Sequence, residues 1–275
     1  MNHGLSSKIV SSMTIVVAVV LASLLITWAV VPTLAIIPDP SCIPTGFFRD
    51  NMDMTARVVV ATSGTITSEV DATGCNIGVY FAPSSTGTVN NANIHGANYF
   101  GVVVHRASVD ISNSQIHDIG ETPFNGAQHG LAVYYATVDS GSPLFQPACT
   151  SGSTTGTVDS NTIWNYQKGG IIVNCEGSMV TITNNDVTGL GQVNYIAQNG
   201  IQFGFGAQGE ARGNKISDNF YTGCSNQDAA KTGCTPYVSA GLLMFDVLAN
   251  EVKHSMNTFR NNQFNLLLVN SHSLM

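Results

Sequence analysis

The chain has 275 residues and a formal net charge of -7, and only 10% of its residues are charged although 44% are hydrophobic. Ordinary soluble domains carry roughly 25% charged residues. The polar surface must therefore consist mainly of Asn, Ser, Thr, Gln and Gly, which favours β structure over helices covered with Lys and Glu. The acidic balance provides no basic stripe, which argues against a nucleic-acid partner.

Residues 1–37 are predicted to be a signal peptide or a membrane anchor. Lys8 is their only charged residue, and it precedes an uncharged run, residues 9–38, that is dense in Val, Leu, Ala and Ile. Cleavage after Thr33-Leu34-Ala35 fits a secretory signal, whereas the length of the run also fits a spanning helix of about 20 residues. Both interpretations place the rest of the chain outside the cell or on the extracellular face of its envelope. Any membrane contact is then confined to this segment.

The six cysteines fit an exported protein, in which an even number favours disulfides. A zinc site is disfavoured, because the sequence has no C-x-x-C pair and no cluster of histidines. No metal site and no cofactor are therefore expected. The predicted disulfides are Cys42 with Cys75, Cys149 with Cys175, and Cys224 with Cys234.

Residues 58–275 repeat one pattern, and residues 38–57 are predicted to be a linker or N-terminal cap before it. Each repeat has one apolar marker residue, with small or apolar residues at alternate positions before it and a polar turn between them. A second, Gly-led apolar strand follows, as in GVVV from Gly101, and GLAV from Gly130 aligns in the same way. The marker residues are Ile94, Ile116, Ile163, Val187, Ile216 and Phe259.

The shortest repeat, from Ile94 to Ile116, has 22 residues. A strand, a crossover helix and a second strand need about 30 or more, so each repeat is expected to be one coil of three short strands. Stacked coils pair each strand with its equivalents above and below, which satisfies the backbone donors and acceptors. The sequence therefore predicts an all-β domain, a single-chain parallel β-helix (a solenoid) of about six to seven coils.

Four asparagines stand at one register, two positions before the marker residue. Asn tolerates the left-handed backbone of a tight bend, and its amide can bond to the Asn of the next coil. We therefore predict one column, the Asn ladder, formed by Asn161, Asn185, Asn214 and Asn257.

The repeated [VI]-x-[SDTR]-x-N-x-[IV] pattern resembles that of the right-handed parallel β-helix proteins of the pectin-lyase-like superfamily. The resemblance covers roughly residues 58–271 and is greatest to uncharacterised exported prokaryotic members. It implies a right-handed coil. The superfamily includes pectate lyases, polygalacturonases, alginate epimerases, tailspikes and adhesins, so the resemblance also implies a polysaccharide or cell-surface glycan as partner.

Insertions after Ile116, Val187 and Ile216 leave the same edge of the predicted stack and are expected to form a wall of loops along it. The first of these loops is rich in titratable groups. Asp118 and Glu121 are candidates for the pair of carboxylates that glycoside cleavage needs, with His129 beside them. A turn-forming role is the alternative for Asp118, because Asn165 and Asp218 occupy the same position in other coils.

Arg212 is a candidate base for a lyase, and only in that case is Ca²⁺ expected as a cofactor. Aromatic residues on or beside the loop-bearing edge are candidates for substrate binding, because flat rings with polar rims suit sugar faces. The alternative is that they pack the long loops onto the coils. These residues are Trp164, Tyr166, Tyr195 and Tyr221.

No helix follows the last apolar strand at residues 266–269, and open ends of solenoids expose core and unpaired strand edges. Homo-oligomerisation through this C-terminal coil is therefore expected. As for function, the sequence favours an exported β-helix that binds glycan without catalysis or serves as a cell-surface structural module. The alternative is an enzyme that degrades or modifies polysaccharide: a pectate-lyase-like lyase, a glycoside hydrolase or a uronate epimerase.

Overall fold

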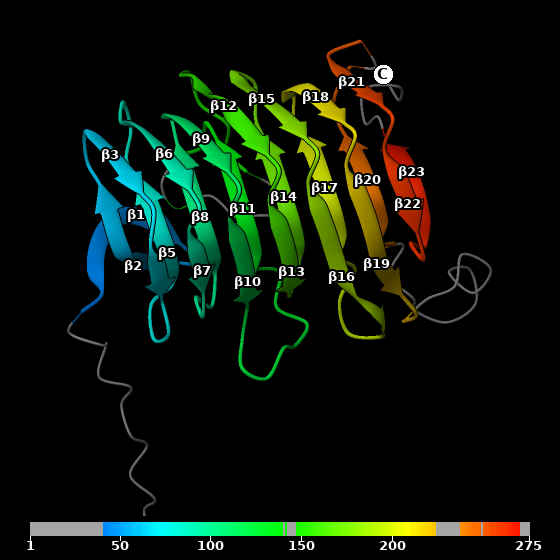
Figure 1. Ribbon diagram of the computed structural model, residues 1–275, viewed down its shortest axis with the longest axis horizontal. Coiled ribbons are helices and arrows are strands. Elements are labelled where there is room, and N and C mark those ends of the chain that lie inside the picture. The colour runs from blue at the N-terminus through cyan, green and yellow to red at the C-terminus, as the bar shows by residue number, and fades with distance from the viewer. Residues whose placement is uncertain (1–40, 140, 142–146, 224–236, 249, 270–275) are drawn as a thin grey trace, which may run out of the picture. The chain divides into compact units, whose positions relative to one another are not determined.

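The computed structural model describes residues 41–139, 141, 147–223, 237–248 and 250–269 (Figure 1). The predicted signal or anchor segment lies outside these residues, and so does the predicted Cys224–Cys234 pair. Within them, every regular element is a β-strand, and none is a helix with the length and hydropathy needed to cross a membrane.

The strands form three sheets, here called A, B and C, and each coil contributes one strand to each sheet. Sheet A contains, in spatial order, β1 (Ile43–Arg49), β2 (Met52–Val60), β5 (Ile77–Phe81), β8 (Phe100–His105), β11 (Leu131–Ala136), β14 (Gly169–Asn174), β17 (Asn199–Gly204), β20 (Ala240–Phe245) and β23 (Phe264–Val269).

Sheet B contains β3 (Ser63–Ile66), β6 (Thr86–Asn90), β9 (Ser108–Ser112), β12 (Thr154–Asp159), β15 (Ser178–Thr183), β18 (Gln208–Arg212) and β21 (Val252–Ser255). Sheet C contains β4 (Glu69–Asp71), β7 (Asn93–His95), β10 (Gln115–Ile119), β13 (Thr162–Tyr166), β16 (Asp186–Val193), β19 (Lys215–Tyr221) and β22 (Thr258–Arg260).

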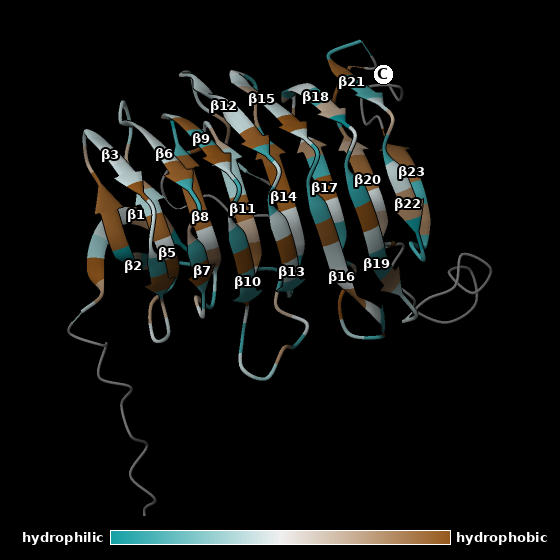
Figure 2. Cartoon of the chain, in the orientation of Figure 1, coloured by the Kyte–Doolittle hydropathy of each residue, from teal (hydrophilic) through white to brown (hydrophobic). Residues whose placement is uncertain are grey.

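The predicted parallel β-helix is confirmed. Neighbouring strands in each sheet are parallel, except that β1 pairs antiparallel with β2. Complete coils run from β2–β4 to β20–β22. The predicted cap region, residues 38–57, contains β1 and the beginning of β2. Alternating hydropathy along the strands is visible in Figure 2, and it sends one set of side chains into the interior of the coils.

The marker residues form one column in sheet C, from Val70 and Ile94 at one end to Phe259 at the other. One coil differs from the expected alignment. Val133, not Leu131, pairs with Val102, so the strand after Gly130 is shifted by two residues. Ala132 then occupies the position equivalent to Gly101. This position needs a small residue, because a Cβ on Gly101 would lie 2.7 Å from Ile116 Cγ2.

The Asn ladder is confirmed. The backbone and side-chain amides of Asn161 both donate to Asn185 Oδ1, at 3.0 and 2.9 Å. The same pair of bonds joins Asn185 to Asn214 and Asn214 to Asn257. Each ladder amide also donates to a carbonyl of the preceding coil, as Asn214 does to Ile182 O at 2.9 Å. The ladder is therefore a row of satisfied polar groups, and its first three members are buried.

The sequence led us to expect a left-handed backbone at the ladder Asn itself. In the structure, the left-handed residue at this corner is the one before the ladder Asn. Ser160, Asn184 and Gly213 have φ values of 57°, 56° and 70°. A left-handed residue turns the chain sharply between sheets B and C. The turn aims the following Asn side chain into the interior, where it reaches the next coil.

We expect Asn214→Ala to lower the free energy of unfolding by about 2–4 kcal/mol, because it leaves the buried amide of Asn185 without an acceptor. Chemical denaturation measures the loss. Lys215→Ala, at the exposed next position, is the control and should change stability by less than about 0.5 kcal/mol. Equal losses in the two variants would contradict a stabilising ladder.

Sheet A is apolar on both faces. One face lines the interior, and the other carries a second hydrophobic cluster that includes Phe47, Tyr80, Phe100 and Tyr134. Phe47 comes from β1, which lies over this outer face; its ring centroid is 5.6 Å from that of Tyr80 and 6.2 Å from that of Phe100. An arm, β1 together with residues 136–139 and 147–150, therefore covers the N-terminal half of the outer face.

Two disulfides hold the covering segments in place, and both were predicted. Cys42, which directly precedes β1, bonds to Cys75. Cys149, at the end of the insertion that follows β11, bonds to Cys175. Structural disulfides are typical of an oxidising compartment, so they support a location outside the cytoplasm.

His105 joins the two layers beneath the arm. Its Nδ1 lies 2.9 Å from the Tyr80 hydroxyl and its Nε2 lies 2.9 Å from Val138 O. The carbonyl can only accept, so Nε2 carries the proton and Nδ1 accepts from Tyr80. Burial lowers the pKa of His105 to about 4, and the imidazole is therefore neutral in the folded protein at neutral pH.

Because the pKa of His105 is depressed on folding, the unfolded chain binds the extra proton first as the pH falls. Stability should therefore decrease between about pH 6.5 and pH 4, by on the order of 3 kcal/mol from this residue. Denaturation of the protein and of His105→Gln across this range measures it. If the stability of the two proteins depends on pH in the same way, the acid sensitivity comes from residues other than His105.

Candidate functional site: a groove on sheet A

Asp118, a predicted catalytic residue, occupies a turn. Its φ is 54°, and the equivalent residues Asn165, Asp218 and Asn261 have φ values of 51°, 61° and 52°. Asn165 donates to Asp118 Oδ1, and Asn261 donates to Asp218 Oδ1 at 3.1 Å. The position is thus a second column of turn residues, which recurs in β10, in β13, in β19 and just after β22.

The carboxylate of Asp118 is stabilised in its charged form. Partial burial raises its pKa, but hydrogen bonds from Asn165 and His117 outweigh this and leave the pKa below the usual value. His117 Nδ1 lies 2.6 Å from Asp118 Oδ2. A general acid needs a raised pKa at neutral pH, so this environment favours the turn-forming role.

Glu121 and His129 contact each other, with Glu121 Oε1 2.7 Å from His129 Nε2. The His129 ring stacks on Tyr99, with centroids 3.8 Å apart, and the Tyr99 hydroxyl donates to Asp50 Oδ2 at 3.2 Å. The structure therefore brings Glu121 and His129 together, in a hydrogen-bonded group separate from that of Asp118.

Arg212 does not join either group. It ends β18 in sheet B, just before β19, where it lies 3.5 Å from Glu210. β10, which carries Asp118, and β19 are separated by β13 and β16. Three strand spacings of about 4.8 Å place Arg212 about 14 Å from Asp118 along the stack alone. The two side chains cannot flank one sugar linkage.

The predicted substrate-binding aromatics have different positions. Tyr166 is fully buried and its hydroxyl donates to Asn219 Oδ1 at 2.6 Å, so its expected surface role is wrong. The left-handed Asn165 before it reverses the strand alternation and turns the ring inward. Tyr195 is 39% exposed, and Tyr221 is partly buried.

Trp164 belongs to a column of stacked rings on the outer face of sheet C. His95, His117 and Trp164 stack with centroid distances of 5.2 and 4.2 Å and interplanar angles of 11°. One face of the Trp164 ring is therefore covered by His117. A sugar that bound there would lose the ring face that makes Trp a good partner.

A groove of about 540 Å³ lies on the part of the outer face of sheet A that the arm leaves open. Its floor crosses the strands from β11 to β23, a distance of about 19 Å for four strand spacings. Apolar and aromatic side chains dominate the lining, which consists of Gln128, Leu131, Lys168, Ile172, Asn174, Ala197, Asn199, Gln202, Phe205, Tyr237, Val238, Leu243, Phe245, Leu267 and Val269.

Two phenylalanines shape one side of the groove. Phe205 follows β17 and Phe245 ends β20, with ring centroids 5.2 Å apart and a tilt of 57°. Phe205 has a φ of 58°, the left-handed value of a corner residue. Both rings are only partly buried, so the groove offers aromatic surface as well as aliphatic floor.

Amide side chains form a chain across the floor. Asn199 Nδ2 donates to Gln202 Oε1 at 3.2 Å, and Gln202 Nε2 donates to Asn174 Oδ1 at 3.1 Å. Asn199 Oδ1 accepts from the backbone of Ala240 at 3.2 Å. Each amide is thus held in one orientation, and Gln202, the member of the chain that is only partly buried, presents its amide to the groove.

Lys168 is the charged residue of this lining. Its ammonium donates to Ala197 O at 2.6 Å, and burial lowers its pKa to about 8. An anion that bound beside it would stabilise the charged form. The lining therefore combines apolar surface, ordered amides and one cation of adjustable charge.

The first loop of the predicted wall, residues 117–129, borders one edge of the groove through Gln128. Gln167 is fully buried, and its Oε1 accepts from the backbone of Glu121 and Asn125 at 3.0 and 3.2 Å. Its Nε2 donates to Ala127 O at 2.8 Å. Glu121 of the predicted catalytic set thus lies in a loop that Gln167 fixes beside the groove, and the set itself is not part of the lining.

The sequence pattern does not reveal the groove, because the floor of the groove uses the outward positions of the Gly-led strands. Ile172, Gln202, Leu243 and Leu267 form one outward column. The available signal was the continuous apolar character of these strands, as in GLLM from Gly241, which is typical of a sheet covered on both faces.

A metal centre does not emerge from the described residues: none of their His, Cys, Asp and Glu side chains form a group of three or more that could hold an ion. Asp159 lies in the same column of sheet B as Arg212, with Thr183 between them. Its carboxylate accepts from Thr183 at 2.6 Å and from Asn184 at 2.9 Å. Those donors stabilise its charge without an ion.

A stack of parallel coils, in which each coil contacts only its neighbours, defines the class of solenoid proteins. The family description "right handed beta helix region" matches residues 57–264. The chain therefore belongs to the right-handed β-helix family, as the repeat pattern predicted. No curated protein matches the chain.

We expect the ammonium of Lys168 to titrate near pH 8, charged below and neutral above, because the groove desolvates it. NMR observation of the lysine side chains during a pH titration, with Lys168→Met to assign the signal, measures the midpoint. A midpoint at the ordinary value of about 10.4 would show that the groove is open to water at this point.

Proposed function

We propose that this protein binds an extracellular polysaccharide along the sheet A groove and holds it without cleaving it. The observation that carries the proposal is the composition of the lining: Phe205 and Phe245 beside an ordered chain of amides. Aromatic rings pack against the C–H faces of sugars, and amides offer the paired donors and acceptors that hydroxyl groups need.

The shape of the groove supports a chain-like ligand. It runs along the stack across five strands of sheet A, from Leu131 to Leu267, and equivalent positions recur at each strand spacing of about 4.8 Å. A polymer can contact successive coils in the same way, whereas a compact ligand would use one part of the groove only.

The lining supports binding more directly than hydrolysis. Glycoside cleavage uses two carboxyl groups about 5–10 Å apart across the bond, and the described lining residues include no Asp or Glu. Lys168 is the lining residue that changes charge near neutral pH, and it favours a glycan that carries carboxylate or sulfate groups.

A screen of the full-length protein against neutral and acidic polysaccharides tests the proposal. Phe245→Ala should weaken binding about tenfold through the loss of ring contact, and Gln202→Ala should weaken it further because it interrupts the amide chain. Arg212→Ala, on sheet B away from the groove, is the control and should bind as the unaltered protein does. Equal binding by all three variants would exclude the groove.

The same screen separates binding from catalysis. Asp118→Ala and Glu121→Ala should leave binding unchanged, and no unsaturated or reducing ends should appear. Release of such ends, abolished by either substitution, would establish an enzyme instead. For an acidic glycan, affinity should fall as the pH rises through about 8 and Lys168 loses its charge, and Lys168→Met should remove this pH dependence.

A further inference from the structure

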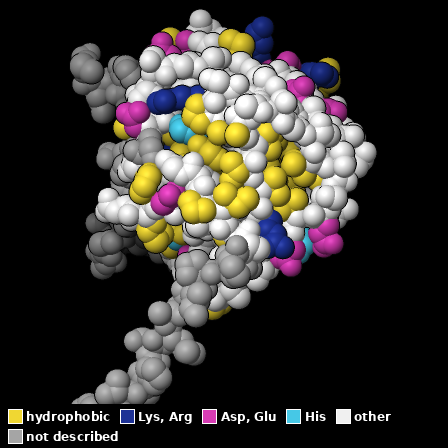
Figure 3. Space-filling view, turned by 90° about the vertical axis from the view of Figure 1, so that its left-hand side faces the viewer, with side chains coloured by type: hydrophobic (Ala, Val, Ile, Leu, Met, Phe, Trp, Pro, Cys, Tyr) yellow, Lys and Arg dark blue, Asp and Glu magenta, His cyan; other side chains and the backbone are white. Residues whose placement is uncertain are grey.

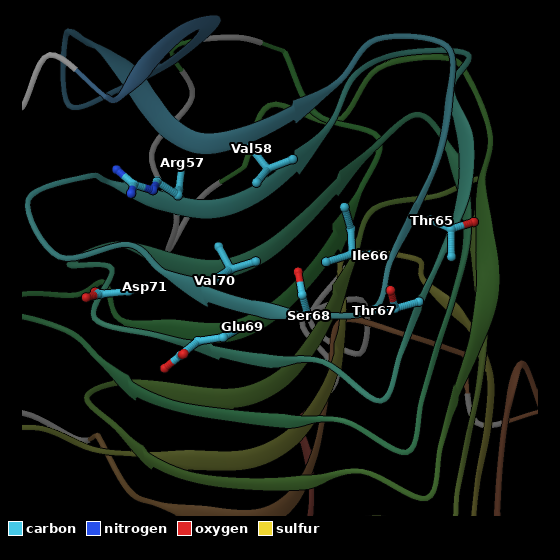
Figure 4. Close-up of a pocket in the computed structure, with 9 residues that line it drawn as sticks. All are labelled: Arg57, Val58, Thr65, Ile66, Thr67, Ser68, Glu69, Val70 and Asp71. Atoms are coloured by element: carbon cyan, nitrogen blue, oxygen red, sulfur yellow. The ribbon is translucent and has the colours of Figure 1, made fainter.

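The N-terminal end of the β-helix exposes part of its interior. Figure 3 shows apolar side chains gathered at the centre of this end, with charged side chains around them. Val58, Ile66 and Val70 come from β2, β3 and β4 and line a hollow of about 380 Å³. In Figure 4 they project into the coil, whereas Glu69 and Asp71 project from its rim.

The C-terminal end exposes the same interior columns. Leu266 and Leu268 of β23 are 40% and 45% exposed, although their equivalents in β20, Leu242 and Met244, are buried. Phe259 of β22 is only partly buried against the core. In the described part of the chain, β21, β22 and β23 are the last strands of their sheets.

The two ends match residue by residue when the columns are extended by one coil. In sheet C, the register that relates Val70 to Ile94 and Ile216 to Phe259 would set Phe259 of one copy against Val70 of the next. Arg260 would then face Asp71. In sheet A, Leu266 would face Val58.

We propose that copies of this protein stack end to end, with the C-terminal coil of one copy on the N-terminal coil of the next. Apolar interior residues would then cover apolar interior residues, and the unpaired edges of β21 and β22 would pair with those of β3 and β4. Such pairing removes exposed strand edges, which otherwise invite unspecific association.

Charge selects this head-to-tail arrangement over the symmetric ones. The C-terminal rim carries Lys253 and Arg260, and Arg260 is 75% exposed beside Asp218. The N-terminal rim carries Glu69 and Asp71, which are 68% and 57% exposed, and one basic residue, Arg57, so acidic groups outnumber basic groups in the lining of the hollow. Two C-terminal ends would bring basic groups together and two N-terminal ends would bring acidic groups together, and like charges in register are destabilising.

The arm limits the contact without preventing it. Among the described residues, β1 pairs with β2 only as far as Ala56, opposite Ile43, so β1 does not occupy the edge of β2 from Val58 to Val60 that would face a neighbouring copy. Therefore only the second half of β23 in one copy can pair with β2 of the next copy and so continue sheet A. The interface is small for a protein–protein contact, and association should depend strongly on concentration. Because it is heterologous, it builds open chains rather than closed dimers.

Sedimentation of the full-length protein over a range of concentrations tests the proposal. The unaltered protein should form species larger than dimers. Arg260→Asp and Asp71→Arg should each weaken association roughly tenfold, because each places like charges in register. An equal mixture of the two variants should associate as the unaltered protein does, since each then meets its complementary end. Failure of the mixture to recover would overturn the head-to-tail arrangement.

Arg212→Asp is the matched control, because Arg212 is also an exposed arginine beside an acid, at 3.5 Å from Glu210, but it lies one strand inside the C-terminal edge, on β18, which β21 covers. Its association should be unchanged. Thermal unfolding of each variant shows that loss of association is not loss of fold. A protein that stays monomeric at every concentration would overturn the proposal.

Photo-crosslinking identifies the partner surface directly. A benzophenone amino acid at Ile66, which points inward at the N-terminal end, should cross-link to residues 252–255 of another copy. The same group at the exposed neighbour Thr65 should not. Cross-links to residues 1–40 of the same chain, or to detergent, would show that something other than a second copy covers this end.

Discussion

The structure depends on parallel hydrogen bonding between equivalent strands of successive coils. Each strand of the central coils is paired on both sides, so its backbone groups are satisfied only when its neighbours keep the same register. The Asn ladder extends this constraint to side chains, because each ladder amide bonds both to the next Asn and to a backbone carbonyl of the preceding coil. A coil that slipped by one residue would lose both sets of bonds at once and would turn its apolar side chains outward.

This constraint also determines where function can be located. Pairing occupies the backbone and fills the interior, so only the outer faces and the loops are free to vary. Sheet A has an apolar outer face, of which the arm and its disulfide cover one half. The other half is the groove. The hydrophobic surface that would otherwise be a liability is therefore used in two ways: to anchor the arm, and to present a surface for a ligand.

Much of the fold could be predicted from the sequence, because the coil repeats. The marker column and the Asn ladder could be recognised as patterns, because the same physical requirement recurs in every coil. The two disulfides followed from the even number of cysteines in a chain that resembles exported proteins. Most other features that occur once were not predicted. Tyr166 was expected at the surface, and it is buried because a single left-handed residue, Asn165, interrupts the alternation. The groove was missed because outward apolar positions look the same in sequence whether an arm covers them or not. Lys168 reaches the lining through loop geometry that the repeat does not encode.

The repetition has a consequence for how such a molecule can change over time. Each coil contacts only its two neighbours, so duplication of one coil inserts a layer of about 4.8 Å and leaves every other layer intact. The ladder would gain one rung and the groove would lengthen by one step, with the same amide and apolar positions repeated. Ligand length can thus be adjusted in whole steps by gene duplication, without redesign of the scaffold.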